Sequence, residues 1–171
     1  MKLIGAVIVL LAATLFGFFQ ALQLARRPRQ IRELVSVLQR LETEIVYGST
    51  PLPEALRSIA GHSGEPAGSL LRDVASGLIS KPQAPLREQW HEACLRAWRR
   101  SAMKAPELEA FSRLGATLGL SDRIDQAKHL RLAAAQLQAE EESARDDQRR
   151  YETMWRSLGV LVGALIVILM Y

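Results

Sequence analysis

The stretch IRELVSVLQRLETEIVYGSTPLPEALRSIAG, residues 31–61, repeats apolar side chains every three or four positions, stops at a glycine and starts again after a proline-rich turn. Its first half carries Ile31, Leu34, Val35, Leu38, Leu41 and Ile45. This spacing is typical of an amphipathic helix, which Gly48 ends. In the second half we expect Thr50 to be the N-cap, Pro51 the first helical residue and Gly61 the end. The stretch therefore predicts two consecutive helices.

The same spacing recurs four more times toward the C-terminus. Breakers precede the third and fourth helices, as HSGEP at 62–66 and KPQAP at 81–85, and the fifth helix begins near Pro106 and closes at Gly119. The sixth starts at Ser121, and no Gly or Pro interrupts it before Gly159, so it can run unbroken into the apolar C-terminal segment. No alternating strand pattern appears. The expected fold class is all-α, a bundle of six helices.

Both ends of the chain are apolar. Leu3 to Leu24 contain no charge, and as a helix they would measure about 33 Å, enough to cross a bilayer core. We therefore predict a transmembrane helix over residues 1–24. A cleaved signal peptide is the alternative, but this run is longer than a usual signal core and no small-x-small cleavage site precedes the arginines that follow.

The C-terminal segment, Leu158 to Tyr171, is also uncharged, and it would give about 21 Å of helix. We predict a short second membrane helix over 157–171. A buried core helix is the alternative, although such a helix would not need apolar residues on every face. Gly159 and Gly163 form a GxxxG pair, a weak sign of close helix packing. The expected domain between the spans covers residues 25–156.

Charge places this domain relative to the membrane. The chain has 22 basic and 18 acidic residues, but without Lys2 and the four arginines of ARRPRQIR, residues 25–32, the remainder is nearly neutral. Arginine beside a membrane helix marks its cytoplasmic side. Arg26, Arg27, Arg29 and Arg32 are therefore expected to determine topology and, secondarily, to contact anionic headgroups. Residues 25–156 should be cytoplasmic with both termini across the membrane, and nucleic acid is not the expected partner.

Catalytic chemistry has little support in the sequence. The single cysteine, Cys94, follows His91 by three positions, a spacing that a nucleophile with its base or a metal site could use. Cys94 also shares a helix face with Trp90 and Ala97, where a small core residue is more usual. Trp90 and Trp98 are likewise expected in the core. We predict a protein that is not an enzyme and has no cofactor or metal.

Two corners carry the candidate partner-binding residues Glu42, Glu44, Tyr47 and Asp122. Glu42 falls on the apolar stripe of the first helix, whereas Glu44 points away from it. A carboxylate on a buried face needs a partner or solvent. Glu42 therefore either forms an ion pair with an arginine of the bundle or marks a face that receives another protein. In the second corner, LGLSD at 118–122, Ser121 is the expected cap and Asp122 is expected to be exposed.

Four segments resemble one known family: RPRQIREL, LQRLETEIVYGSTPLPEAL, LGATLGLSDRIDQAKHL and LGVLVGALIVIL. They are similar to the corresponding parts of stage III sporulation protein AB of endospore-forming bacteria, over nearly the whole chain. Residues 61–110 match loosely, so nothing there is carried over. The family in turn resembles the helical domain of the inner-membrane platform protein of type II secretion and type IV pilus machines.

The resemblance implies a non-catalytic platform in the complex that links mother cell and forespore, seated in the mother-cell membrane around the forespore. Its expected partners are the other proteins of the same stage III operon, above all the cytoplasmic ATPase, stage III sporulation protein AA. The platform would relay the motor's movements or only organise the complex. The alternative is a membrane-tethered regulator that binds nucleic acid or anionic lipid through the juxtamembrane arginines. The sequence leaves the oligomeric state open, self-association included.

Overall fold

The computed structural model describes the backbone of residues 2–48, 50–119 and 122–170, and the side chains of residues 25–48, 50–119, 122–151 and 154. The elements are α1 (Lys2–Tyr47), α2 (Leu52–Gly61), α3 (Ala67–Ser80), α4 (Leu86–Trp98), α5 (Ala105–Ser112), the 3₁₀ turn η1 (Arg113–Ala116) and α6 (Arg123–Met170). These ranges contain six α-helices and no strand. The predicted all-α class is confirmed.

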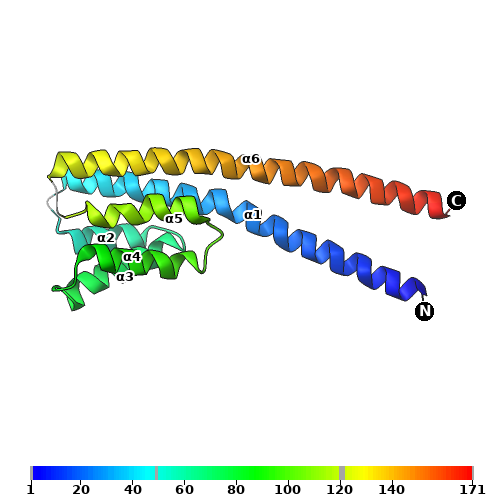
Figure 1. The fold of residues 1–171 in the computed structure, drawn as a ribbon, viewed down its shortest axis with the longest axis horizontal. Helices are drawn as coiled ribbons and strands as arrows, with labels where there is room; N and C mark the ends of the chain where they lie inside the picture. Colours follow the sequence, from blue (N-terminus) through cyan, green and yellow to red (C-terminus); the bar gives the residue numbers. More distant parts are fainter. Residues whose placement is uncertain (1, 49, 120–121, 171) are drawn as a thin grey trace.

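Two long helices organise the molecule. α1 and α6 run antiparallel and side by side, and both extend well beyond the short helices α2 to α5, which pack together along one half of the pair (Figure 1). The two chain ends lie at the same end of the molecule. The opposite end, where α1 stops and α6 begins, is called the tip below and is formed by the described residues among 44–52 and 119–126.

The core is built from the apolar stripes that the sequence predicted. Ile31, Leu34, Val35, Leu38 and Leu41 of α1 are buried. α6 faces α1 largely with small side chains. The buried residues of α6 in this interface are Ala127, Leu130, Ala133, Ala134, Leu137 and Ala144. The contact between α1 and α6 is the most extensive in the molecule, because these are the two longest helices and they lie side by side.

An aromatic cluster joins α4 to α5. Trp90 is fully buried and stacks on Phe111, with ring centroids 5.3 Å apart. Its indole Nε1 donates to the Phe111 carbonyl oxygen at 2.9 Å, which satisfies the polar atom of this buried ring. Gly115 of η1 lies against the same tryptophan, and a Cβ at that position would come within 2.7 Å of the Trp90 Cβ. The predicted core role of Trp90 and Trp98 is confirmed, since both are buried.

Two helix ends differ from the expectation. The N-cap of α2 is Pro51 rather than Thr50, because Pro51 has an extended ψ of 144° and its carbonyl accepts the first helical hydrogen bonds from Glu54 and Ala55. The fifth α-helix ends at Ser112 and continues as the 3₁₀ turn η1. Gly119, where the fifth helix was predicted to close, lies beyond η1 and has a φ of +80°, which favours glycine.

The predicted flanking helices are not separate elements. Both expected domain boundaries, 24/25 and 156/157, fall inside continuous helices, and α1 continues through Pro28. The bundle's first and last helices are therefore the same helices that contain the apolar ends. The side chains of the predicted spans, 1–24 and 157–171, lie outside the described residues. Among the described residues, no helix offers a stretch long and apolar enough to cross a membrane.

Candidate functional site: the tip

The two corners that the sequence treats separately meet at the tip. A groove of about 270 Å³ lies between the end of α1, the start of α2 and the beginning of α6. Its lining residues are Glu44, Ile45, Gly48, Thr50, Pro51, Leu52, Ala55, Gly119, Arg123 and Gln126. The tip is the part of the bundle farthest from both chain ends (Figure 1). A surface at this end is accessible to a partner whatever surrounds the terminal segments.

Glu42 forms an ion pair with an arginine of the bundle, which is one of the two roles that the sequence left open for it. Arg131 Nε of α6 donates to Glu42 Oε1 at 2.6 Å. The Glu42 side chain is 22% exposed and that of Arg131 is 68% exposed, so the pair lies at the rim of the α1–α6 interface. Exposed pairs of this kind contribute about 0–1 kcal/mol. Glu42 therefore belongs to the bundle, and a stability loss typical of a buried pair is not expected for it.

Glu44 and Tyr47 line and border the groove. Glu44 is half-buried in its wall. Tyr47 is 84% exposed at the last residue of α1, and Ile124, in the first turn of α6, is 83% exposed. Ile124 was not singled out from the sequence. Two large exposed apolar side chains and an acidic one at a single end form a mixture that suits a protein contact.

Asp122 is the N-cap of α6, a role that was expected for Ser121 from the sequence. The backbone N–H of Asp125 donates to Asp122 Oδ1 at 2.7 Å, and the Asp122 carbonyl accepts the first helical hydrogen bond of α6 from Gln126. This is the geometry of an N-cap, which satisfies a helix-terminal N–H group. Asp122 is exposed as predicted. The predicted cap, Ser121, lies outside the described residues.

The four juxtamembrane arginines divide into two kinds. Arg27 is 4% exposed and its Nε donates to Oε1 of the fully buried Glu107 at 2.8 Å, while its other nitrogens contact Glu140 and Asp147 at 3.4 Å. Arg32 Nε donates to Glu141 Oε1 at 2.8 Å. Arg26 and Arg29 are exposed. Two of the four arginines are thus paired with carboxylates of the bundle, and the topology and headgroup role expected for the group stays a prediction.

Glu107 is a residue that sequence reasoning missed. Its Oε2 accepts the Lys104 backbone N–H at 2.9 Å, at the start of α5, while its Oε1 receives Arg27. A carboxylate three residues after the cap position is a known helix-start signal, but the partner of its second oxygen lies 80 residues away in the chain.

His91 and Cys94 do not form a reactive pair. His91 is exposed, and its Nδ1 lies 2.8 Å from Ser112 Oγ across the α4–α5 groove. Cys94 is fully buried, and this burial raises the pKa of its thiol to about 12, so the thiol stays protonated and unreactive at neutral pH. The expected core role of Cys94 is confirmed. In the part of the chain that the structure describes, no group of His, Cys, Asp and Glu side chains is arranged to hold a metal ion.

Comparison with known proteins points to one family. The model of the family described as stage III sporulation protein AB matches residues 2–171. Stage III sporulation protein AB of Bacillus subtilis (strain 168) is 39% identical over 170 residues, which cover 99% of each chain. A solved structure of stage III sporulation protein AB superposes with a TM-score of 0.68 at 37% identity, and the match covers 73% of this chain and 98% of that one.

Proposed function

Because the chain belongs to the stage III sporulation protein AB family, we propose that it is a non-catalytic platform component of the stage III sporulation complex. In this proposal α1 and α6 anchor the protein in the mother-cell membrane around the forespore, with the bundle in the cytoplasm. The tip then binds the cytoplasmic ATPase, stage III sporulation protein AA. The other proteins of the same operon are further expected partners.

One observation carries the docking proposal: the two corners meet at the end of the bundle opposite both chain ends (Figure 1). If the chain ends are in the membrane, the tip is the part that extends farthest into the cytoplasm. It presents Tyr47 and Ile124 to solvent beside Glu44 and the groove. Aromatic side chains are enriched where binding energy is concentrated.

The family name supports a sporulation role and names no enzyme class. The described residues also favour a binding function, since the buried thiol of Cys94 is protonated and His91 contacts Ser112 instead. The alternative, a regulator that binds nucleic acid through the arginines, has less support, because Arg27 and Arg32 are already paired with carboxylates of the bundle.

Recruitment of the ATPase to membranes that contain the full-length protein tests the docking proposal. Replacing Tyr47 and Ile124 together by alanine should weaken binding by about tenfold or more, as loss of a central contact does. Glu44→Arg should do the same by reversing a charge in the groove wall. The double alanine variant should leave the melting temperature nearly unchanged, because Tyr47 and Ile124 are almost fully exposed. Glu44 is half-buried, so the melting temperature of Glu44→Arg is measured beside its recruitment.

The control variants separate docking from folding. Leu95→Ala with Leu132→Ala removes two exposed apolar side chains away from the tip and should leave recruitment unchanged. Asp122→Asn removes the charge while retaining an N-cap side chain, so it tests the charge of Asp122 without loss of the cap. Normal recruitment by folded Tyr47→Ala/Ile124→Ala and Glu44→Arg variants would rule out the tip as the docking surface.

A further inference from the structure

We propose that the end of the bundle opposite the tip binds an anionic bilayer surface, and that Arg99 and Arg100 of the α4–α5 loop hold it there together with Arg26 and Arg29. This end is called the exit end below, because α1 and α6 leave the short helices there (Figure 1). The inference rests on the proposed membrane anchoring. It adds a second, sequence-distant basic segment to the contact and fixes the orientation of the bundle.

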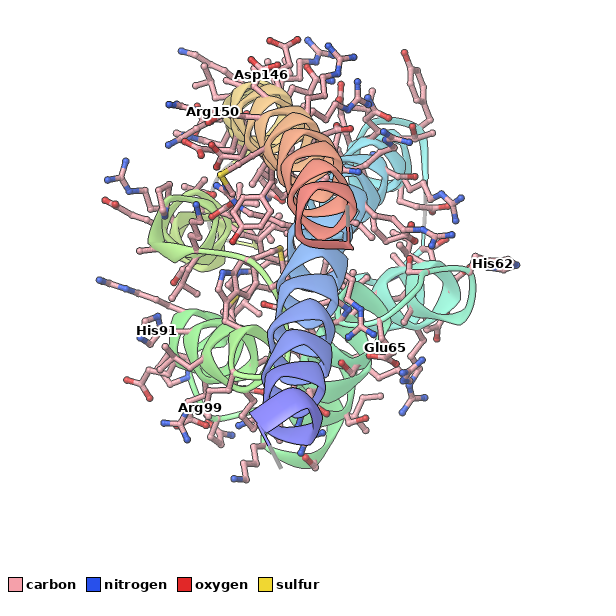
Figure 2. All side chains as sticks on the ribbon, turned by 90° about the vertical axis from the view of Figure 1, so that its right-hand side faces the viewer. His62, Glu65, His91, Arg99, Asp146 and Arg150 are labelled. Carbon is pink, nitrogen blue, oxygen red and sulfur yellow. The ribbon has the colours of Figure 1, made fainter. Side chains whose placement is uncertain are left out.

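The α4–α5 loop is fastened to α1 at the exit end. The backbone N–H of Ala102 donates to Gln30 Oε1 at 2.8 Å. Two exposed arginines, Arg99 and Arg100, come just before Ala102 in the loop. On α1, Arg26 and Arg29 come just before Gln30 and are exposed as well. Figure 2 looks onto the exit end and shows Arg99 and Glu65 on opposite sides of α1. Four exposed arginines from two distant segments therefore share one end of the molecule.

Several acidic groups near the exit end are paired with arginines of the bundle, and Glu33 accepts the backbone N–H of Gly64 at 2.9 Å. Glu140 and Asp147 contact Arg27, and Glu141 contacts Arg32 and Arg145. Hydrogen bonds from Ser69, followed by the ion pair with Arg72, hold the pKa of Glu65 below its usual value.

The exposed arginines, in contrast, lack internal partners. Within the described ranges, no ion pair involves Arg26, Arg29, Arg99 or Arg100. On α6, Figure 2 shows Asp146 and Arg150 on the same side of the helix, so charges of both signs are present there. The cationic excess of this end thus comes from α1 and the α4–α5 loop.

The distance from the membrane fits this contact. Gln30 lies six residues beyond Leu24, where the predicted span ends, which corresponds to about 9 Å along a helix. The headgroup layer on each side of the hydrocarbon core is about 5–7 Å thick. An extended arginine side chain from a loop at the level of Gln30 can therefore reach lipid phosphates. Arg26 and Arg29 also line a hollow of about 500 Å³ between α1 and the α2–α3 loop, together with the carboxylates of Glu33 and Glu65. The arginines are therefore expected to reach phosphates from the rim of this hollow and not to hold them inside it.

The test uses the full-length protein in nanodiscs that contain a nickel-chelating lipid, with phosphatidylcholine alone or mixed with phosphatidylglycerol. A nitroxide at Ala105→Cys, an exposed residue next to the loop, reports proximity to the nickel. Gln83→Cys is the distant control, because its loop precedes Leu86, which packs against Gly119 at the tip. Cys94 is fully buried and should not take up the label.

Relaxation of the label at position 105 should increase in the phosphatidylglycerol nanodiscs and weaken at high salt, while the label at position 83 stays unaffected. Each arginine near an anionic surface favours the bound state about fivefold. Arg99→Gln with Arg100→Gln should therefore lower the ratio of membrane-bound to unbound bundles by about 25-fold. The matched control, Arg40→Gln with Arg87→Gln, removes two exposed arginines elsewhere and should change nothing.

The outcomes distinguish this inference from the anchoring on which it rests. Protein that inserts into nanodiscs but shows no effect of phosphatidylglycerol, or none of the Arg99 and Arg100 changes, would overturn the binding to the bilayer surface and leave the anchoring intact. Full-length protein that does not insert at all would overturn both. Trp90 and Trp98 fluorescence during melting provides the check that each variant is folded.

Discussion

At the scale of single residues, burial decides what an ion pair contributes. Arg27 and Glu107 are both almost inaccessible to solvent, and their nitrogen and oxygen lie 2.7 Å apart. Glu42 and Arg131 have a similar separation of 2.6 Å, but Arg131 is mostly exposed. Removing one member of a buried pair leaves an uncompensated charge in a poorly solvated site, whereas water replaces a lost partner at the rim. The two pairs should therefore respond very differently to substitution.

Arg27→Met should destabilise the protein by about 3–5 kcal/mol, because Glu107 is left charged and buried. Adding Glu107→Gln should recover part of this loss, since the glutamine carbonyl can still accept the Lys104 N–H without a buried charge. Glu42→Ala is the matched control and should cost about 0–1 kcal/mol. Chemical denaturation of the three variants measures these differences, and equal losses for Arg27→Met and Glu42→Ala would contradict the assignment.

Cys94 gives the stability a dependence on alkaline pH. Its pKa is raised from 9.0 to about 12 in the folded state by burial, so the unfolded chain loses the thiol proton first. The contribution of the protonated Cys94 thiol to the free energy of unfolding is complete below pH 9. It is lost as the pH rises toward 12, at about 1.4 kcal/mol per pH unit at most. Cys94→Ala should flatten the decline of unfolding free energy between these values. An unchanged alkaline slope in the variant would show that other groups cause the decline.

At the scale of elements, the short 3₁₀ turn η1 depends on a glycine for its packing. Gly115 has no Cβ, and a methyl group there would approach the Cβ, Cγ and Cδ1 of Trp90 to within 3 Å. These atoms lie at the root of the Trp90 side chain. The indole ring is held in place by stacking on Phe111 and by its hydrogen bond to the Phe111 carbonyl oxygen. They cannot move aside as the end of a flexible side chain would. The contact between α4 and η1 therefore requires glycine at position 115.

Gly115→Ala should destabilise the protein by about 1–3 kcal/mol, the usual cost of overpacking a core. Gly61→Ala is the control, because nothing lies within 4 Å of a Cβ built at that position, and it should be neutral or slightly stabilising. Denaturation curves followed by tryptophan fluorescence compare the two. The packing argument would be wrong if Gly115→Ala were as stable as Gly61→Ala.

At the scale of the whole molecule, the long helices separate two surfaces. The tip lies at one end of the bundle and the exit end at the other, with both chain ends beyond the exit end (Figure 1). This polarity follows from the antiparallel packing of α1 and α6, which brings the two ends of the chain to one side. A protein of this shape can contact a membrane and a cytoplasmic partner at the same time, as the proposed platform role requires.

The topology proposal predicts that a cysteine at Gln83, exposed in the α3–α4 loop, does not react with a membrane-impermeant maleimide in intact cells. It should react after the cells are permeabilised. The positive-inside distribution of Arg26 and Arg29 is the physical reason. Cys94 provides the internal blank, because it is fully buried. Labelling of the Gln83→Cys protein in intact cells would place the bundle outside the cytoplasm.

The sequence by itself determined the helices, their order and their buried stripes. Apolar spacing, prolines and Gly119 act over a few residues, so the stretch 31–61 contains the information for its own two helices. The boundary differences at Pro51 and Ser112 are equally local, and they reflect backbone geometry that spacing alone cannot give. The sequence also anticipated the exposure of Asp122, and an arginine partner was one of the two roles that it left open for Glu42.

Only the tertiary structure decided which distant residues meet. It placed the end of α1 beside the start of α6, so that Tyr47, Ile124 and the groove share one tip. It buried Arg27 against Glu107 while Arg26 and Arg29 stayed exposed. The sequence of residues 25–32 alone does not show which of its four arginines is buried. The physical reason is that burial depends on which helix faces pack together. That choice is made by contacts between segments far apart in the chain, whereas helix formation is decided within a few turns.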